Sequence, residues 1–283
     1  MINFNGTTIE NNSKKLPLEN RGYMWGDALF ETLKVVNSKI LFWEDHYFRL
    51  MASMRILRME IPMSFTMEFL ETEILKTIEA NNLNASTVKV RFNVDRGEGG
   101  EFLPTKKSIN YSIETEKLEG DSYLIVETSN LYSVDLFKDY FTAPGLLNSL
   151  NTNNKIINVL GSIYAKENDL DNCLLLNTDK NLIGALNGNL FLVNDDKIKT
   201  PPILDGCING IMRKQIMELI KNSHDFQIEE ASISVFELQK ADELFITNVI
   251  QGIKPVITYR KKNYGTKVSQ DLLKRLNAKL NLV

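Results

Sequence analysis

The stretch from Thr200 to Ile220 has the residue types of an anion-binding site. Asn209 and Gly210 precede a run whose apolar residues recur at helical spacing, so Asn209 is expected to cap a helix that ends at Ile220. The first backbone amides of that helix, those of Ile211 and Met212, would then point at an anion, which is how helix starts bind phosphate. An Asn-Gly pair before an amphipathic helix can also be a simple start signal.

The elements that position such a site are expected in the stretch from Leu150 to Val193. Asn154 can cap a helix with one apolar face. That face consists of Ile156, Ile157, Leu160, Ile163 and Tyr164. The apolar run Cys173–Leu176 is short enough for a buried strand, turn residues occupy 178–181, and Asn189–Val193 is a further strand. The stretch therefore predicts a half-buried helix followed by two strands.

The composition excludes several classes of protein. Of the 283 residues, 43% are hydrophobic and 24% charged, as in an ordinary globular protein. The length exceeds what one hydrophobic core usually holds, so it predicts two domains. A net charge of -3 without a dense Lys/Arg block argues against a nucleic-acid or membrane-surface partner and favours a small-molecule ligand or substrate. Two cysteines and two histidines are too few for a disulfide frame or a structural metal site. Without an apolar leader or a membrane-length run, we expect a cytoplasmic protein.

The first 116 residues alternate between predicted strands and helices, which is an α+β pattern. The expected elements are a strand at Ile2–Gly6, a hairpin over Leu29–Leu41 that turns at Asn37-Ser38, helices over 44–57 and 67–81, and strands over 88–94 and 108–113. The charged, glycine-bearing stretch 115–121 is typical of a connection between domains. We therefore expect an N-terminal domain over 1–116 and a C-terminal domain over 121–283 that closes with an amphipathic helix over 268–280.

Motifs along nearly the whole chain resemble the fold-type IV pyridoxal-phosphate enzymes, the class IV aminotransferase family. This family includes branched-chain and D-amino-acid aminotransferases and 4-amino-4-deoxychorismate lyase. The motifs are RGYMWGDALFET at 21–32, HYFRL at 46–50, Asn154 with the helix ending in Ala165-Lys166, NLF at 189–191, TPPIL at 200–204, CINGIMR at 207–213 and ELFITNVIQGIKPV at 243–256. The last motif is closer to the lyases. The resemblance implies a two-domain α+β, D-amino-acid aminotransferase-like fold with a pyridoxal phosphate cleft between the domains.

The resemblance also implies roles for individual residues. Arg49 stands at the family's arginine that holds the cofactor phosphate, and a guanidinium fork matches two phosphate oxygens. Considered alone, Arg49 would instead pair with Glu44 or Asp45 on the surface of its helix. The amides of Ile211 and Met212 would bind the same phosphate.

Further residues are expected beside the phosphate or the substrate. Thr247 and Asn248 would lie by either group, whereas Phe30 and Arg91 would lie on the substrate side. The glycine-rich loop after Arg91, at 97–100, either lines the substrate mouth or only makes a turn.

Two positions depart from the family pattern. Asn151 stands where the family keeps the lysine that forms the Schiff base, and Gly184 stands where it keeps the glutamate that pairs with the pyridine nitrogen. An asparagine cannot form an imine, and a glycine leaves the ring nitrogen without an acidic partner. Lys155 is a candidate substitute at the first helical turn. The alternative is an outward-facing lysine that only begins a helix.

Two functions remain open at this point. The first is an aminotransferase or lyase that acts on an amino acid or an amino-chorismate-like substrate and recruits Lys155 or works by altered chemistry. The second is a catalytically inactive homologue that keeps the fold and the phosphate cup of Arg49, Ile211 and Met212 as a binding or scaffold protein. A third explanation is that Asn151 is an engineered or erroneous change at a true lysine. The second departure from the family pattern, Gly184, argues against a single designed substitution.

The resemblance leads to three further expectations. A cleft between the domains would be lined by Arg49, Asn151, Lys155, Gly184, Ile211 and Thr247. Pyridoxal phosphate, if bound, would be held non-covalently through its phosphate. The chain would form a homodimer, with Tyr23, Trp25 and Phe30 as aromatic contact surface.

Overall fold

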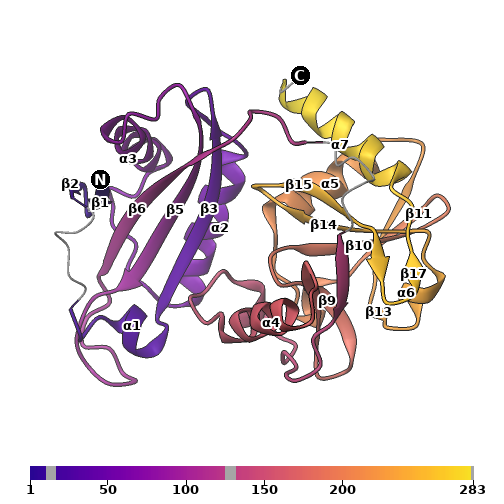
Figure 1. Cartoon of the computed structure of the whole chain (residues 1–283). Helices are drawn as coiled ribbons and strands as arrows, with labels where there is room; N and C mark the ends of the chain where they lie inside the picture. The colour runs from indigo at the N-terminus through magenta and orange to yellow at the C-terminus, as the bar shows by residue number, and fades with distance from the viewer. Residues whose placement is uncertain (11–16, 125–131, 282–283) are drawn as a thin grey trace. The chain divides into compact units, whose positions relative to one another are not determined.

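The computed structural model describes residues 1–10, 17–124 and 132–281, which form two compact units (Figure 1). Unit 1 comprises Met1–Asp121 and Asn151–Asn154, and unit 2 comprises Ser122–Leu150 and Lys155–Val283. Each unit combines sheet and helix, so the α+β prediction is confirmed. In the parts of the chain that the structure describes, every helix is too short or too polar to cross a membrane.

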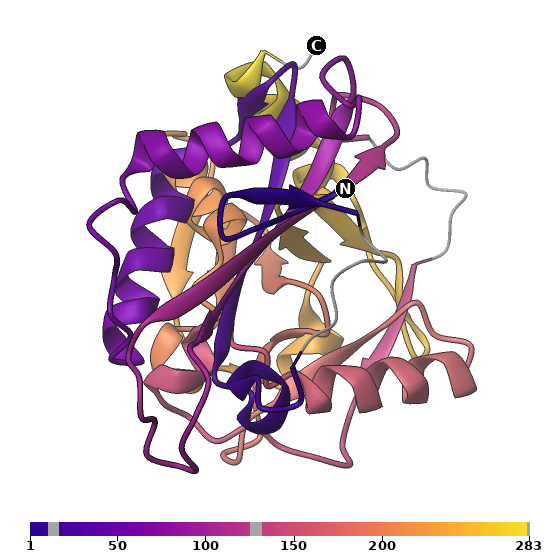
Figure 2. The same cartoon turned by 90° about the vertical axis from the view of Figure 1, so that its left-hand side faces the viewer.

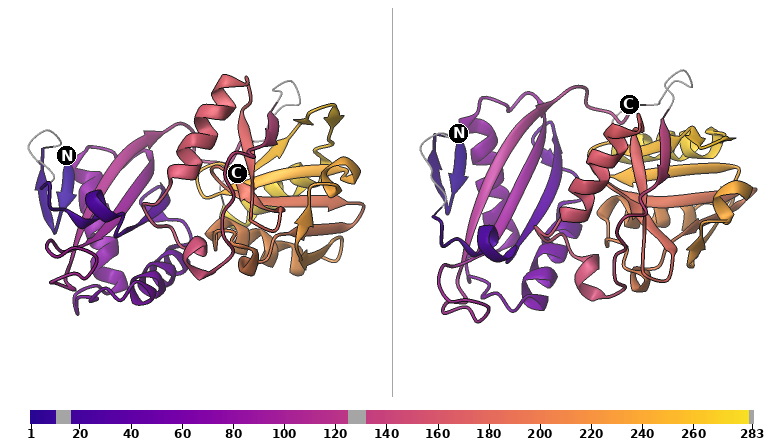
Figure 3. Two further views of the ribbon diagram at one scale, coloured as in Figure 1. Left: turned by 90° about the horizontal axis from the view of Figure 1, so that it is seen from below. Right: turned by 60° about the horizontal axis from the view of Figure 1, so that its bottom comes forward.

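Unit 1 is built on an antiparallel sheet with the strand order β2-β1-β6-β5-β3-β4, and Figure 3 shows β1 and β2 at its edge. The strands are β1 (Ile2–Phe4), β2 (Thr7–Ile9), β3 (Ala28–Val36), β4 (Lys39–Ile40), β5 (Thr87–Arg96) and β6 (Ile109–Leu118). The β3–β4 hairpin turns at Asn37 and Ser38, both with positive φ, as the sequence predicts. Residues 115–118, expected in the domain connection, instead continue β6 because they pair with β5.

Three helices accompany this sheet: α1 (Arg21–Trp25), α2 (Trp43–Ile56) and α3 (Met67–Ala80). Helix α2 contacts β3 and helix α3 contacts β6, and Figure 2 shows both helices on one side of the strands. Alternate strand residues are fully buried, among them Leu33, Val90 and Ile113, while α3 contributes Leu70 and Ile74. The period of two in the strands and the apolar helix faces therefore produce the core of unit 1.

Unit 2 contains two sheets, with strand orders β12-β11-β10-β14-β15 and β13-β9-β8-β7-β16-β17. The strands of the first sheet are β10 (Asn189–Asn194), β11 (Lys197–Thr200), β12 (Gln227–Glu230), β14 (Glu243–Asn248) and β15 (Gly252–Val256). Those of the second are β7 (Ser133–Leu136), β8 (Asn172–Leu176), β9 (Asn181–Ala185), β13 (Ile233–Ser234), β16 (Thr258–Tyr259) and β17 (Lys262–Asn263). The predicted strands at 173–176 and 189–193 are confirmed.

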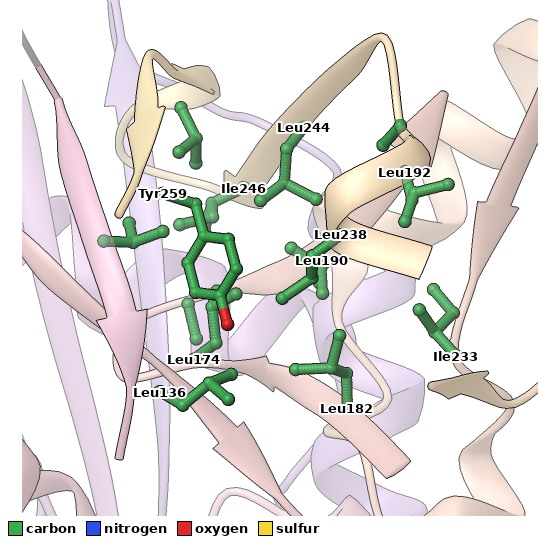
Figure 4. Close-up of a cluster of buried hydrophobic side chains, with 14 of the residues drawn as sticks. Leu136, Leu174, Leu182, Leu190, Leu192, Ile233, Leu238, Leu244, Ile246 and Tyr259 are labelled. Carbon is green, nitrogen blue, oxygen red and sulfur yellow. The ribbon is translucent and has the colours of Figure 1, made fainter. Parts of the chain in front are cut away.

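Side chains from both sheets form the main core of unit 2, shown in Figure 4. Leu174 and Leu182 come from one sheet, and Leu190 and Leu244 come from the other. Strand β8 is buried at every position and β10 at all but its last, which explains their continuous apolar runs. The helices of unit 2 are η1 (Leu146–Ser149), α4 (Ile156–Glu167), η2 (Ile203–Asp205), α5 (Ile211–Lys221), α6 (Glu237–Lys240) and α7 (Lys267–Leu280).

The two predicted helix caps are wrong, although both helices exist. Helix α4 follows Lys155 without a side-chain cap, because Asn154 is drawn to α1, where its Nδ2 lies 3.4 Å from the Gly26 carbonyl. Helix α5 follows Gly210, also without a side-chain cap. In both cases tertiary contacts override the local capping preference of asparagine.

A buried ionic cluster lies between strand β3 and helix α2 in unit 1. Arg49 Nε donates to Glu31 Oε1 at 2.8 Å, Arg49 Nη2 donates to Glu31 Oε2 at 2.5 Å, and His46 Nδ1 lies 2.7 Å from Glu31 Oε2. The carboxylate that pairs with Arg49 thus comes from the adjoining strand, whereas spacing along the helix suggested Glu44 or Asp45. The cluster ties the helix to the sheet.

The charge state of this cluster follows from its burial. Burial alone raises the pKa of Glu31, but the charge of Arg49 and the hydrogen bonds from His46 and Arg49 outweigh it and hold that pKa below its ordinary value. Burial lowers the pKa of His46, although Glu31 acts in the opposite direction. His46 is therefore neutral near neutral pH, with its Nδ1 proton toward Glu31. Its Nε2 is buried without a hydrogen-bond partner among the described residues.

We predict that unit 1 loses stability in acid in two stages. Both folded-state pKa values lie below the unfolded ones, so the unfolded chain binds protons first and each group's contribution is lost as pH falls. The free energy of unfolding should fall below pH 6.5 through His46 and below pH 4.5 through Glu31. Each slope is at most about 1.4 kcal/mol per pH unit. Urea unfolding followed by tryptophan fluorescence reports unit 1, because Trp25 and Trp43 both lie there.

The matched variant is His46→Gln, which should lose the upper stage and keep the lower one. Glu31→Gln leaves the Arg49 charge without its carboxylate and should cost about 3–5 kcal/mol. Identical pH profiles for the wild type and His46→Gln would show that His46 does not titrate differently on folding.

Candidate functional site

The start of helix α5 lies against the ends of strands β10 and β14 in unit 2. A Cβ at Gly210 would overlap the carboxamide of Asn189, so any other residue there requires the Asn189 side chain to move. Asn189 Nδ2 donates to the Ile208 carbonyl at 2.8 Å, and Asn189 is paired with Thr247 on the neighbouring strand. The helix start, Asn189 and Thr247 are therefore gathered at one place.

The first amides of α5 are suited to an anion. The helix has no side-chain cap, and its backbone ladder begins with Lys214 N donating to Gly210 O at 3.0 Å. The amides of Ile211, Met212 and Arg213 precede that ladder. The first N–H groups of a helix have no acceptor within the helix. Because the helix dipole also favours negative charge here, the donor set fits a phosphate group.

Thr247 gives a second, independent indication of a polar ligand. Its side chain is buried, with 1% exposure of the residue, and its hydroxyl has no hydrogen-bond partner among the described residues. Buried hydroxyls are nearly always hydrogen-bonded, and an unsatisfied one costs about 1–3 kcal/mol. A phosphate oxygen beside the helix start is an acceptor that would satisfy it.

Other motif residues hold the helix start in place. Arg213 Nη2 donates to the Pro201 carbonyl at 2.9 Å and to Glu230 Oε2 at 2.7 Å. The Thr200 hydroxyl donates to the Leu190 carbonyl at 2.8 Å. The Thr-Pro-Pro turn and Arg213 therefore position α5 against β10.

Asn248 is occupied within the turn after β14. Its Oδ1 accepts from the amides of Ile250 at 3.1 Å and Gln251 at 2.9 Å, and its Nδ2 donates to Gln251 Oε1 at 3.0 Å. Sequence analysis placed Asn248 beside the phosphate or the substrate. In the structure it shapes the β14–β15 turn, so Thr247 is the residue of this pair with hydrogen-bonding capacity to offer.

Gly184 lies where strand β9 becomes irregular. Leu175 is paired with Gly184 but Leu176 with Leu182, so Ile183 forms a bulge. The φ of Gly184 is +152°, and a Cβ there would lie 3.0 Å from the Gly188 carbonyl oxygen. A Cβ at Gly188 would in turn lie 2.6 Å from the Thr247 carbonyl oxygen. Gly184 is thus connected through Gly188 to the strand end that carries Thr247.

Within unit 1, Arg49 is paired with Glu31 through Nε and Nη2. Glu31 was not identified by sequence analysis, although it stands in the FET part of the motif at 21–32. Its signal was an acidic residue inside an apolar strand pattern.

The two expected substrate residues lie together on the other face of β3. The Arg91 guanidinium carbon is 4.0 Å from the centre of the Phe30 ring, and Arg91 Nε donates to Asn93 Oδ1 at 3.0 Å. Lys34, which sequence analysis missed, lies on the same face because strand side chains alternate. Burial lowers the pKa of Lys34 to about 8, against the opposing charge of Asp121.

The segment before α4 lacks the expected amine. Phe30 N donates to the Asn151 carbonyl at 2.9 Å and Asn153 N to the Ala28 carbonyl at 3.0 Å, so residues 151–154 are held by unit 1. Between Lys138 and Lys155 the sequence contains no lysine, so no shift of register along this segment supplies one. Lys155 itself belongs to unit 2, as the residue that precedes α4.

The chain matches proteins of known type along most of its length. The model for amino-transferase class IV matches residues 28–259. The D-alanine aminotransferase of Listeria innocua is 26% identical over 270 residues, which cover 89% of this chain and 85% of that protein.

Solved structures share the fold. 4-Amino-4-deoxychorismate lyase from Pseudomonas aeruginosa has a TM-score of 0.83 at 22% identity, with 99% of this chain and 100% of that chain covered. The branched-chain amino acid aminotransferase of T.th., complexed with N-(5′-phosphopyridoxyl)-L-glutamate, has a TM-score of 0.86 at 19% identity, with 100% and 94% covered. The expected D-amino-acid aminotransferase-like fold class is confirmed, and the family match includes segments of both units. The chain belongs to the class IV aminotransferase family.

Proposed function

We propose that this chain binds pyridoxal phosphate through the phosphate group, without an imine to a lysine, and serves as a binding protein that has lost the family's covalent chemistry. The observation that carries the proposal is the combination of an intact anion cradle in unit 2 with a segment from 139 to 154 that contains no lysine. The cradle comprises the amides of Ile211 and Met212 and the hydroxyl of Thr247.

Relatives support the choice of ligand. The T.th. branched-chain aminotransferase was solved with N-(5′-phosphopyridoxyl)-L-glutamate and, separately, with pyridoxamine 5′-phosphate. When bound by an enzyme through a lysine, pyridoxal phosphate acts as an electron sink for a substrate carbanion. In this chain the cradle would hold and orient the phosphate through charge-assisted hydrogen bonds. Asn151 and Gly184 offer neither an amine nor an acid.

The competing function is an aminotransferase or lyase that uses Lys155. Its support is that Lys155 lies at the start of α4, close in sequence to the expected lysine position. Lys34 offers a second amine, whose lowered pKa favours the neutral, nucleophilic form. Both amines make the proposal testable by chemical trapping.

We predict that borohydride reduction of the protein with excess pyridoxal phosphate leaves no pyridoxyl group on Lys155 or Lys34. The ligand should also wash out on dialysis, because a phosphate clamp alone offers a few hydrogen bonds of roughly 1.5–3 kcal/mol each. Mass spectrometry of tryptic peptides locates any reduced adduct, and the absorption spectrum before reduction shows whether an imine is present.

Lys155→Gln and Lys34→Gln are the matched controls for this trapping. The proposal requires both to bind pyridoxal phosphate as the wild type does. A stoichiometric adduct on Lys155 that is absent from Lys155→Gln would overturn the proposal in favour of the enzyme.

We also propose a homodimer whose contact surface includes an aromatic patch on unit 1. The patch consists of Tyr23, Trp25, Phe102 and Leu103, of which Phe102 and Leu103 are 83% and 84% exposed. The rings of Trp25 and Phe102 are 4.9 Å apart, and Arg21 donates to the carbonyls of residues 99, 100 and 101, which holds the loop. Exposed apolar groups on a firmly held loop are typical of an interface. Phe30, also expected on this surface, has the Arg91 guanidinium over its ring.

We predict that the wild type sediments as a dimer at micromolar concentration and that the double change Phe102→Ser with Leu103→Ser yields monomers. Removal of two apolar contacts from the centre of a patch should weaken association by several kcal/mol. Phe236→Ser, at another highly exposed aromatic in unit 2, is the control and should leave the dimer intact. A dimer that survives the double change would place the interface elsewhere.

A further inference from the structure

We infer that the cradle of unit 2 does not recognise a ring nitrogen, so that pyridoxal phosphate has no binding advantage over its analogue with carbon in place of that nitrogen. This inference rests on the proposed function, since it concerns the same site. It extends the ligand class from pyridoxal phosphate to phosphate monoesters of similar ring shape.

The backbone at Gly184 is the first step of the argument. Its φ of +152° is a conformation that side chains of L-residues rarely adopt, and a Cβ would meet the Gly188 carbonyl oxygen at 3.0 Å. The bulge at Ile183 creates this geometry. An acidic side chain at 184 therefore requires rearrangement of the β9 end, and a single substitution cannot simply restore a carboxylate there.

Among the described residues of β9, β10 and their connection, no acid replaces it. From Lys180 to Val193 the sequence has no aspartate or glutamate. The acid on β14 is Glu243, which is paired with Val193, at the opposite end of the strand from Thr247. Its carboxylate is engaged by the amides of Val268 at 2.7 Å and Ser269 at 3.0 Å.

The consequence concerns the proton on the ring nitrogen. A pyridinium in a protein interior needs an ionised partner, because burial without one favours the neutral form. A neutral nitrogen without a donor or a carboxylate has no charge-assisted hydrogen bond to gain. Such a bond would favour the nitrogen ring by about tenfold to a hundredfold, so its absence removes that advantage over the carbon ring.

The test is calorimetric titration of the full-length protein with pyridoxal phosphate and with the benzaldehyde analogue that lacks the ring nitrogen. Inorganic phosphate serves as competitor. We expect pyridoxal phosphate to bind no more than about twofold tighter than the analogue, and both dissociation constants to rise when phosphate is added. Binding of pyridoxal phosphate at least tenfold tighter than the analogue would overturn the inference while leaving the proposed function standing. Failure of both to compete with phosphate would overturn the proposed function as well.

Variants at Gly184 test the structural part. Gly184→Ala and Gly184→Glu should both lower the melting temperature, and Gly184→Glu should not create a preference for the nitrogen ring. Gly265→Ala is the matched glycine control, because a Cβ there meets nothing closer than 3.5 Å. A Gly184→Glu protein with wild-type melting temperature and a tenfold preference for pyridoxal phosphate would show that the backbone accepts the acid.

Discussion

The close approach of the α5 start to the ends of β10 and β14 is the constraint on which the candidate site depends. Gly210 permits this approach because any side chain there would overlap Asn189, and Gly188 permits a similar approach to the Thr247 backbone. Asn189 then fills the gap by donating to the Ile208 carbonyl. The site is therefore a product of backbone packing, and its donors are largely main-chain groups that any sequence compatible with this packing would present.

Glu31 in unit 1 and Thr247 in unit 2 are two buried polar groups in different surroundings. In unit 1, Glu31 brings together Arg49 and His46, so that a buried carboxylate is balanced by a cation and by hydrogen bonds. In unit 2, Thr247 remains without a hydrogen-bond partner among the residues described, beside uncapped helical amides. The carboxylate of Glu31, with its partners in place, is explained by stability, whereas an unsatisfied hydroxyl close to a helix start is better explained by a ligand.

Much of the fold could be predicted from local pattern, and the failures have a common physical cause. The hairpin at Asn37-Ser38 and the runs at 173–176 and 189–193 follow from turn chemistry and burial, which act over a few residues. The caps at Asn154 and Asn209 failed because tertiary packing decides the role of each helix start. The partner of Arg49 was missed because Glu31 lies on a strand 18 residues earlier. The φ of Gly184 depends on the bulge at Ile183, which the hydrophobic pattern of the sequence does not reveal.

The same distinction bears on the proposed function, in which a phosphate cradle is kept without covalent chemistry. Amides at a helix start persist as long as the helix and its glycine persist, because folding itself maintains them. Folding does not maintain a catalytic amine in the same way. An exchange of lysine for asparagine would remove a side chain whose burial is unfavourable, and it would not change the core between the sheets of unit 2. The cradle therefore supports covalent chemistry only weakly. The absence of lysine from residues 139 to 154 argues against covalent chemistry more strongly. Thr247 favours retained binding, because an unsatisfied hydroxyl is a cost that folding alone does not explain.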